Sequence, residues 1–117
     1  MKTTKTLTID GRKIGAGEPP YIVAELSANH QGDIEHALSL IVAAKRAGAD
    51  AVKIQTYTAD TITIDTDGPG FKIESGLWRG RTLYELYQEA STPWEWHADL
   101  FVKARELGLT IFSSPFD

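Results

Sequence analysis

The stretch YIVAELSANH (residues 21–30) is a short apolar run that ends in a cluster of polar side chains. The same design recurs in DAVKIQTY (50–57) and LTIFSSPFD (109–117). Apolar runs of this length are typical of strands in a parallel sheet that helices cover on both faces. Three parallel strands are therefore predicted near residues 21–26, 51–57 and 109–114. Since parallel strands end at a common edge, their polar ends should meet there, where α/β proteins build their sites.

The segments between these strands indicate helices. A first helix should begin at an N-cap, Asp33, and end at Gly48, where a left-handed cap is favoured. A capping box at Thr82 predicts a second helix, and a third should begin at residues 92–95 and end before Gly108. Strand, helix and strand in this order predict a right-handed βαβ unit.

Two further segments frame this unit. TLTIDGRKIG (6–15) indicates a β-hairpin that turns at Asp10-Gly11. Residues 58–81 lack a helical period and contain several Gly and Pro, and a loop of this length is often functional. Three strands alone leave an uncovered face, and a closed barrel takes ~250 residues. We therefore interpret residues 1–117 as the N-terminal part of an α/β TIM (β/α)8 barrel domain that a short hairpin precedes.

Composition limits the classes of function. The 117 residues are 42% hydrophobic and carry a net charge of -4 without basic runs, so neither nucleic acid nor a membrane surface is an expected partner. Cysteine is absent, which excludes disulfides and thiolate metal sites. No apolar run approaches the ~18 residues of a membrane helix, and no signal-peptide pattern is present, so a cytoplasmic location is predicted.

Lys53 interrupts the apolar run of the second strand, where an unpaired ammonium would be costly. It should contact an anionic ligand, extend from the strand end into solvent, or form an internal pair with Glu25. Gln55 shares the face of Lys53 and could hydrogen-bond beside a bound anion, or it could be a solvated strand end. Glu25 could orient a hydroxyl or act in proton transfer, or serve only as the partner of Lys53.

The other candidates follow the outer strands. Asn29 and His30 lie in the loop after the first strand, where substrate contacts are expected. Ser113 and Ser114 end the third strand and could bind phosphate oxygens, although paired serines are common there. The three histidines form no recognisable metal-ligand set, and the tryptophans are interpreted as packing residues.

AELSANHQGD (24–33), AGADAVKIQTY (47–57) and ELGLTIFSSPFD (106–117), in this order and spacing, resemble the start of the sialic acid synthase family. The segment at 76–97 is more similar to its pseudaminic acid synthase branch. Members condense phosphoenolpyruvate with an N-acetylated amino sugar. The resemblance implies a TIM barrel followed by a small antifreeze-like domain, in a homodimer that exchanges these domains.

The resemblance also implies roles for matching residues. Lys53 and Ser114 would contact phosphoenolpyruvate, Glu25 would contact the amino sugar, and Gln55 would belong to the strand-2 site. Asn29 and His30 match a loop of the site without a defined role. A divalent metal, Mn²⁺ or Mg²⁺, would polarise the sugar aldehyde. Its histidine ligands would come from later strands, outside this chain.

The expected reaction uses 2,4-diacetamido-2,4,6-trideoxy-L-altrose and gives pseudaminic acid and phosphate. Synthesis of N-acetylneuraminate or legionaminate is the alternative within the family, and another aldolase-like barrel is the alternative outside it. A non-enzymatic alternative is a structural or interaction module whose open sheet edge recruits another chain. The 117 residues alone are expected to be inactive.

Overall fold

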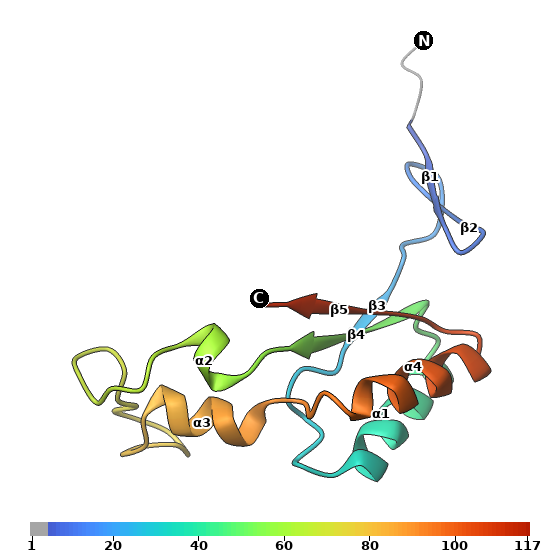
Figure 1. The fold of residues 1–117 in the computed structure, drawn as a ribbon. Coiled ribbons are helices and arrows are strands. Elements are labelled where there is room, and N and C mark those ends of the chain that lie inside the picture. The colour runs from blue at the N-terminus through green and yellow to red at the C-terminus, as the bar shows by residue number, and fades with distance from the viewer. Residues whose placement is uncertain (1–4) are drawn as a thin grey trace.

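Three parallel strands form the centre of the molecule. The computed structural model describes residues 5–117. In it β4 (Ala51–Thr56) lies between β3 (Val23–Glu25) and β5 (Thr110–Pro115), and both pairings are parallel. The order confirms the three predicted parallel strands, although β3 is shorter than the predicted stretch. The carboxyl ends of β4 and β5 point the same way, toward α2 (Ala59–Ile62) and α3 (Leu83–Ala90) (Figure 1).

Two helices cover one face of this sheet. They are α1 (Ile34–Arg46) and α4 (Trp96–Glu106), and they contact each other below the strands (Figure 1). Val52 and Ile54 point from β4 into the core between sheet and helices. Ile41 of α1 and Leu100 of α4 meet them there, and both are almost fully buried. Removal of this apolar surface from water is the main force that holds the helices to the sheet.

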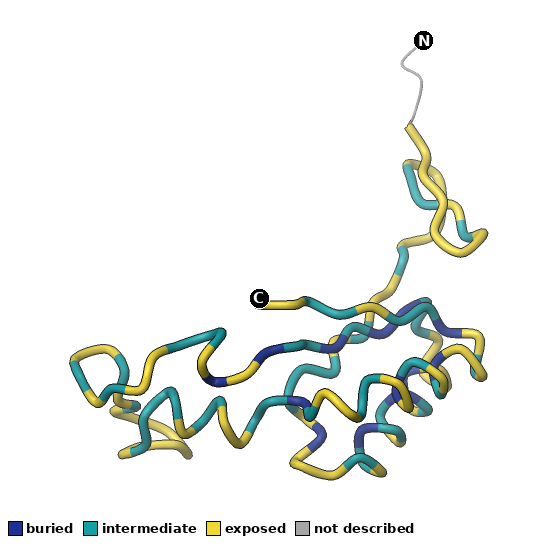
Figure 2. The backbone as a smooth tube through the Cα atoms, viewed as in Figure 1, coloured by how far each residue is buried: buried dark blue, intermediate teal, exposed yellow. Residues whose placement is uncertain are grey.

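The opposite face of the sheet is open within the described residues. Val23 remains 41% exposed and Phe112 remains 42% exposed. In Figure 2 the buried residues lie mainly in β4 and in the two helices below the sheet. The expectation that helices cover both faces is therefore wrong for this part of the chain, because α1 and α4 lie on the same side. Lys53 lies on the open face and is only partly buried.

The predicted helix ends agree closely with the structure. Asp33 caps α1, and its side chain accepts the backbone N–H of Glu35 at 2.9 Å. Thr82 and Glu85 form the predicted capping box of α3 (Leu83–Ala90). Gly48 has a φ of 87°, the left-handed conformation that glycine adopts without strain. Only the third helix differs, because α4 begins at Trp96 instead of at residues 92–95.

The predicted hairpin is present at the opposite end of the sheet. It pairs β1 (Leu7–Ile9) with β2 (Arg12–Ile14) in antiparallel register. Both turn residues have positive φ, 47° at Asp10 and 79° at Gly11. Two side-chain contacts fasten the hairpin where β4 and β5 begin: Arg12 pairs with Asp50, and Thr110 donates to Asp10. The hairpin therefore leaves the carboxyl edge of the sheet free.

The long segment at 58–81 lies beyond the carboxyl ends of the strands (Figure 1). It begins with one short helix, α2 (Ala59–Ile62), and an isolated bridge between Lys72 and Thr82 joins it to the N-cap of α3. This arrangement places the segment next to α3, with which α2 is in contact. Across residues 5–117, no helix combines the length and the apolar character needed to span a bilayer.

Candidate functional site

Lys53 and Glu25 form an ion pair on the open face of the sheet. Strand register sets them side by side, because Glu25 of β3 is the partner of Lys53 in β4. The Nζ of Lys53 lies 2.6 Å from Oε2 of Glu25, with the two side chains 30% and 38% exposed. The internal pair considered from the sequence is thus present. An ammonium has three N–H donors, so this contact leaves two for another acceptor.

Gln55 and Ser114 lie on the same face as this pair. Gln55 follows Lys53 by two residues in β4, and alternate side chains of a strand share a face. Ser114 is the register partner of Gln55 in the neighbouring strand β5. The structure therefore brings four of the predicted residues to one face, near the ends of three strands: Glu25, Lys53, Gln55 and Ser114.

Ser113 does not join this group. It lies on the face that the helices cover, where its Oγ is 2.5 Å from Oγ1 of Thr56. The same Thr56 oxygen lies 2.6 Å from Nε2 of His97, so these groups form one partly buried hydrogen-bond chain. Consecutive side chains of a strand point to opposite faces, so Ser113 and Ser114 cannot both face Lys53.

Asn29 and His30 take different positions, although they are adjacent in sequence. Asn29 lies in the loop after β3, where its side-chain amide donates to the carbonyl of Leu26 at 3.1 Å. His30 turns into the protein and is only 4% exposed, with its ring edge-on to Trp96 at 5.3 Å between centroids. The structure therefore places Asn29 at the carboxyl edge and separates His30 from it.

The imidazole of His30 is held in its neutral form. Burial lowers the pKa of His30 below its ordinary value of 6.5. Its Nδ1 accepts the backbone N–H of Gly32 at 3.0 Å, which requires that this nitrogen carry no proton. The ring thus holds the loop after β3 from inside, whereas its neighbours Asn29 and Gln31 are exposed.

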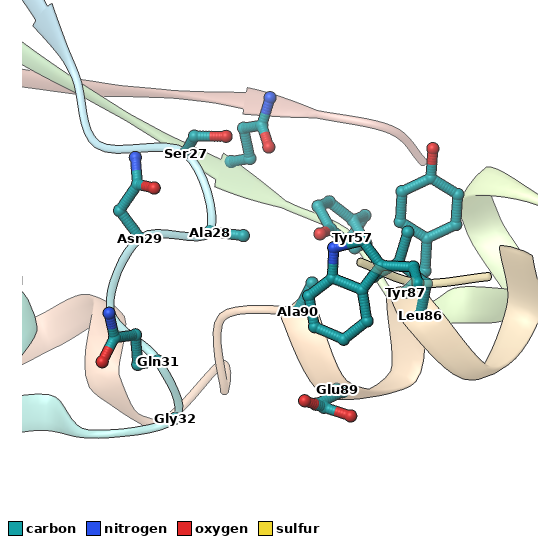
Figure 3. A pocket seen from close by; sticks show the side chains of 12 residues that line it. Ser27, Ala28, Asn29, Gln31, Gly32, Tyr57, Leu86, Tyr87, Glu89 and Ala90 are labelled. Carbon is teal, nitrogen blue, oxygen red and sulfur yellow. The ribbon is translucent and has the colours of Figure 1, made fainter. Parts of the chain in front are cut away.

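A cleft of about 480 Å³ opens beside these residues at the carboxyl edge. Figure 3 shows Asn29 and Gln31 on one side of it and the rings of Tyr57 and Tyr87 on the other. Gln55 also lines the cleft, so the cleft adjoins the face that Lys53 occupies. The volume falls in the range of pockets that bind small molecules.

The aromatic wall of this cleft was not predicted from the sequence. Trp78 lines the cleft from the long segment at 58–81 and remains 40% exposed, so it is not the packing residue expected. Arg81 holds it there, with its guanidinium 5.3 Å from the centre of the indole ring. The sequence shows a tryptophan within a long glycine-rich loop, and this could have indicated a functional residue. The position of the loop depends on its contacts with α3, which the loop sequence alone does not predict.

Residues 40–117 match the NeuB family, and this is most of the chain. The chain belongs to the NeuB family. The resemblance to sialic acid synthases that the strand-end motifs suggested is thereby confirmed. The matched region includes β4, β5 and the three helices that follow α1.

Named relatives of this NeuB-family chain agree with that assignment. The pseudaminic acid synthase of Campylobacter jejuni subsp. jejuni serotype O:2 is 57% identical over 96 residues, which are 82% of this chain and 28% of that protein. The pseudaminic acid synthase of Helicobacter pylori is 56% identical over 99 residues, 85% of this chain and 29% of that protein. The chain thus spans less than a third of the length of these relatives.

A solved structure of the same kind superposes on the chain. It is the N-acetylneuraminic acid synthetase of Leptospira borgpetersenii serovar Hardjo-bovis in complex with citrate, with a TM-score of 0.77 and 25% sequence identity. The match covers 97% of this chain and 35% of that protein. The parallel α/β arrangement is therefore that of a sialic acid synthase-type domain.

The described part of the chain does not supply a metal centre. Within residues 5–117 no group of three or more His, Cys, Asp or Glu side chains is arranged to hold a metal ion. His30 is buried beside Trp96, and His97 is engaged with Thr56. The residues present do not fit the divalent metal that the family resemblance implies.

Proposed function

We propose that this chain is the N-terminal part of a synthase that condenses phosphoenolpyruvate with 2,4-diacetamido-2,4,6-trideoxy-L-altrose. The products are pseudaminic acid and inorganic phosphate. The observation that supports this most strongly is the 57% identity to a pseudaminic acid synthase over 82% of the chain. The arrangement of Lys53, Glu25, Gln55 and Ser114 on one face of the sheet agrees with it.

The proposal includes a TIM (β/α)8 barrel. β3, β4 and β5 would be its first three strands, and the open face of the sheet would line its interior. The position of the Lys53–Glu25 pair supports this, because charged groups at the carboxyl end of a barrel interior are typical of an active site. Residues 1–117 form the first part of that domain. The complete protein would also contain an antifreeze-like domain, form a homodimer and be located in the cytoplasm.

Lys53 and Ser114 would bind phosphoenolpyruvate. The two remaining N–H donors of Lys53 and the Ser114 hydroxyl can hold a multiply charged anion in a fixed position. Carbon C3 of phosphoenolpyruvate then attacks the sugar aldehyde and forms the new C–C bond. Water adds at C2, and phosphate leaves through cleavage of the C–O bond. The residues contribute chiefly by positioning and by charge compensation.

Glu25 would have two roles. Its contact with Lys53 fixes the ammonium, and its second carboxylate oxygen can accept a hydrogen bond from a hydroxyl of the sugar. That second oxygen also accepts the backbone N–H of Ser27 at 3.0 Å, so the carboxylate is held from two sides. The metal ligands are proposed to lie on residues other than those described.

The experiment uses the complete synthase that carries residues 1–117. It is incubated with phosphoenolpyruvate and either the diacetamido sugar or N-acetylmannosamine, and phosphate and the nine-carbon product are measured. We expect turnover with the diacetamido sugar and none by the 117 residues alone. Preference for N-acetylmannosamine, or turnover with neither sugar, would contradict the proposal.

A further inference from the structure

We propose that the cleft beside Gln55 binds the acetamido-bearing side of the sugar and that Trp78 determines selectivity for it. This rests on the proposed function, since it assigns a subsite for the second substrate. The cleft is separate from Lys53, which does not line it. The proposal therefore gives the two substrates different surfaces: the anion over Lys53, and the uncharged sugar in the cleft.

The chemistry of the cleft suits an uncharged ligand that has both amide and methyl groups. Three residues with side-chain amides line the cleft, Asn29, Gln31 and Gln55, and amides can pair with the N–H and C=O of an acetamido group. The rings of Tyr57, Tyr87 and Trp78 line it as well, and they suit methyl groups and the apolar face of a sugar ring.

The charges around the cleft argue against binding of an anion. Among the described residues that line it there is no lysine or arginine. The charged side chain that does line it, Glu89, is paired with Arg81 at 2.6 Å. Burial raises the pKa of Tyr57, so its hydroxyl stays protonated at neutral pH. An uncharged polar ligand is thus the best match.

The position of the cleft favours the second substrate over an unrelated ligand. Gln55 both lines the cleft and shares its strand face with Lys53. Two residues along a strand correspond to roughly 7 Å. A sugar in the cleft would therefore lie next to an anion held by Lys53, as a condensation between the two requires.

Trp78 is held over the cleft by a defined set of contacts. The Arg81 guanidinium lies against the indole ring, pairs with Glu89 and donates to the backbone carbonyl of Glu85 at 3.2 Å. These contacts fasten the long segment at 58–81 to α3. Arg81 is thus a positioning residue, and Trp78 forms the wall that the ligand would touch.

The test compares Trp78→Ala, Trp78→Phe and Leu77→Ala in the complete synthase. Leu77 is the matched control, because it is the neighbouring residue, is 99% exposed and does not line the cleft. Trp78→Ala should raise KM for the diacetamido sugar roughly tenfold or more, since loss of an apolar contact in a pocket has effects of this size. KM for phosphoenolpyruvate should change less than about twofold. Trp78→Phe should keep most of the affinity, and Leu77→Ala all of it.

Saturation-transfer NMR gives a readout that needs no turnover. In the wild-type synthase, saturation should reach the acetamido methyl protons of the sugar, and Trp78→Ala should reduce it. An unchanged sugar KM in a folded Trp78→Ala enzyme, or a larger effect on phosphoenolpyruvate than on the sugar, would overturn the inference while the proposed function stands. Absence of condensation by the wild-type enzyme would instead refute the proposed function.

Discussion

The ion pair between Lys53 and Glu25 is expected to contribute little to the stability of the fold. Both side chains are about a third exposed, and ion pairs of this kind contribute ~0–1 kcal/mol to stability. An apolar side chain in β4 would serve the sheet equally well. This small contribution to stability is consistent with the proposed role of Lys53 in binding an anionic ligand.

His30 gives a prediction about pH. The pKa of His30 is lowered in the folded chain, whereas the unfolded chain takes up a proton near 6.5. The unfolded state thus binds more protons, and the free energy of unfolding should fall as the pH drops below about 6.5, until the pH passes the folded pKa. Urea titrations at about pH 7.5 and about pH 5.5 measure this. The free energy of unfolding of His30→Asn should decrease less between these two pH values. An equal decrease in the wild type and the variant would contradict the role given to His30.

Some site residues could be predicted from the sequence and others could not. Lys53 could be identified as a candidate from the sequence, because a charged residue within an apolar strand is unusual. Strand alternation implies that Ser113 and Ser114 face opposite sides, so only one of them can lie on the face of Lys53. The burial of His30 depends on Trp96, which is 66 positions away in sequence, so no local pattern could reveal it. The place of Trp78 beside the cleft was missed because it depends on how the long loop packs against α3.

At the scale of elements, helix α1 depends on its N-cap. Asp33→Ala removes the acceptor for the Glu35 backbone N–H and should lower the free energy of unfolding by about 1 kcal/mol. Urea unfolding followed by circular dichroism measures the change. Asp33→Asn is the control and should retain most of the stability, because its side-chain oxygen can accept the same bond. Equal losses in both variants would show that the cap is not the cause.

The elements were largely predictable because local chemistry determines their ends. Capping residues and glycines in the sequence predicted the ends of α1, the start of α3 and the hairpin turn to within a few residues. The shortness of β3 and the later start of α4 were not foreseen. Both depend on pairing and packing with distant parts of the chain, which propensity alone does not reveal.

At the scale of the molecule, the open sheet face has a measurable consequence. Phe112 is 42% exposed on this face, and the strands at both edges have unpaired backbone groups within the described chain. The 117 residues should therefore self-associate as concentration rises, and Phe112→Ser should weaken this. Sedimentation velocity provides the measurement, with Leu77→Ser as a control far from the sheet. A wild-type monomer at all concentrations would contradict the prediction.

Lys53 is proposed to bind phosphoenolpyruvate, and calorimetry on the complete synthase tests this most directly. Lys53→Met keeps the apolar stem and removes the ammonium, with Lys13→Met on the exposed hairpin strand as the control. Loss of a paired charge of this kind costs about 2 kcal/mol, so Kd for phosphoenolpyruvate should rise ~30-fold in Lys53→Met and stay the same in Lys13→Met. An unchanged Kd in folded Lys53→Met would contradict the account.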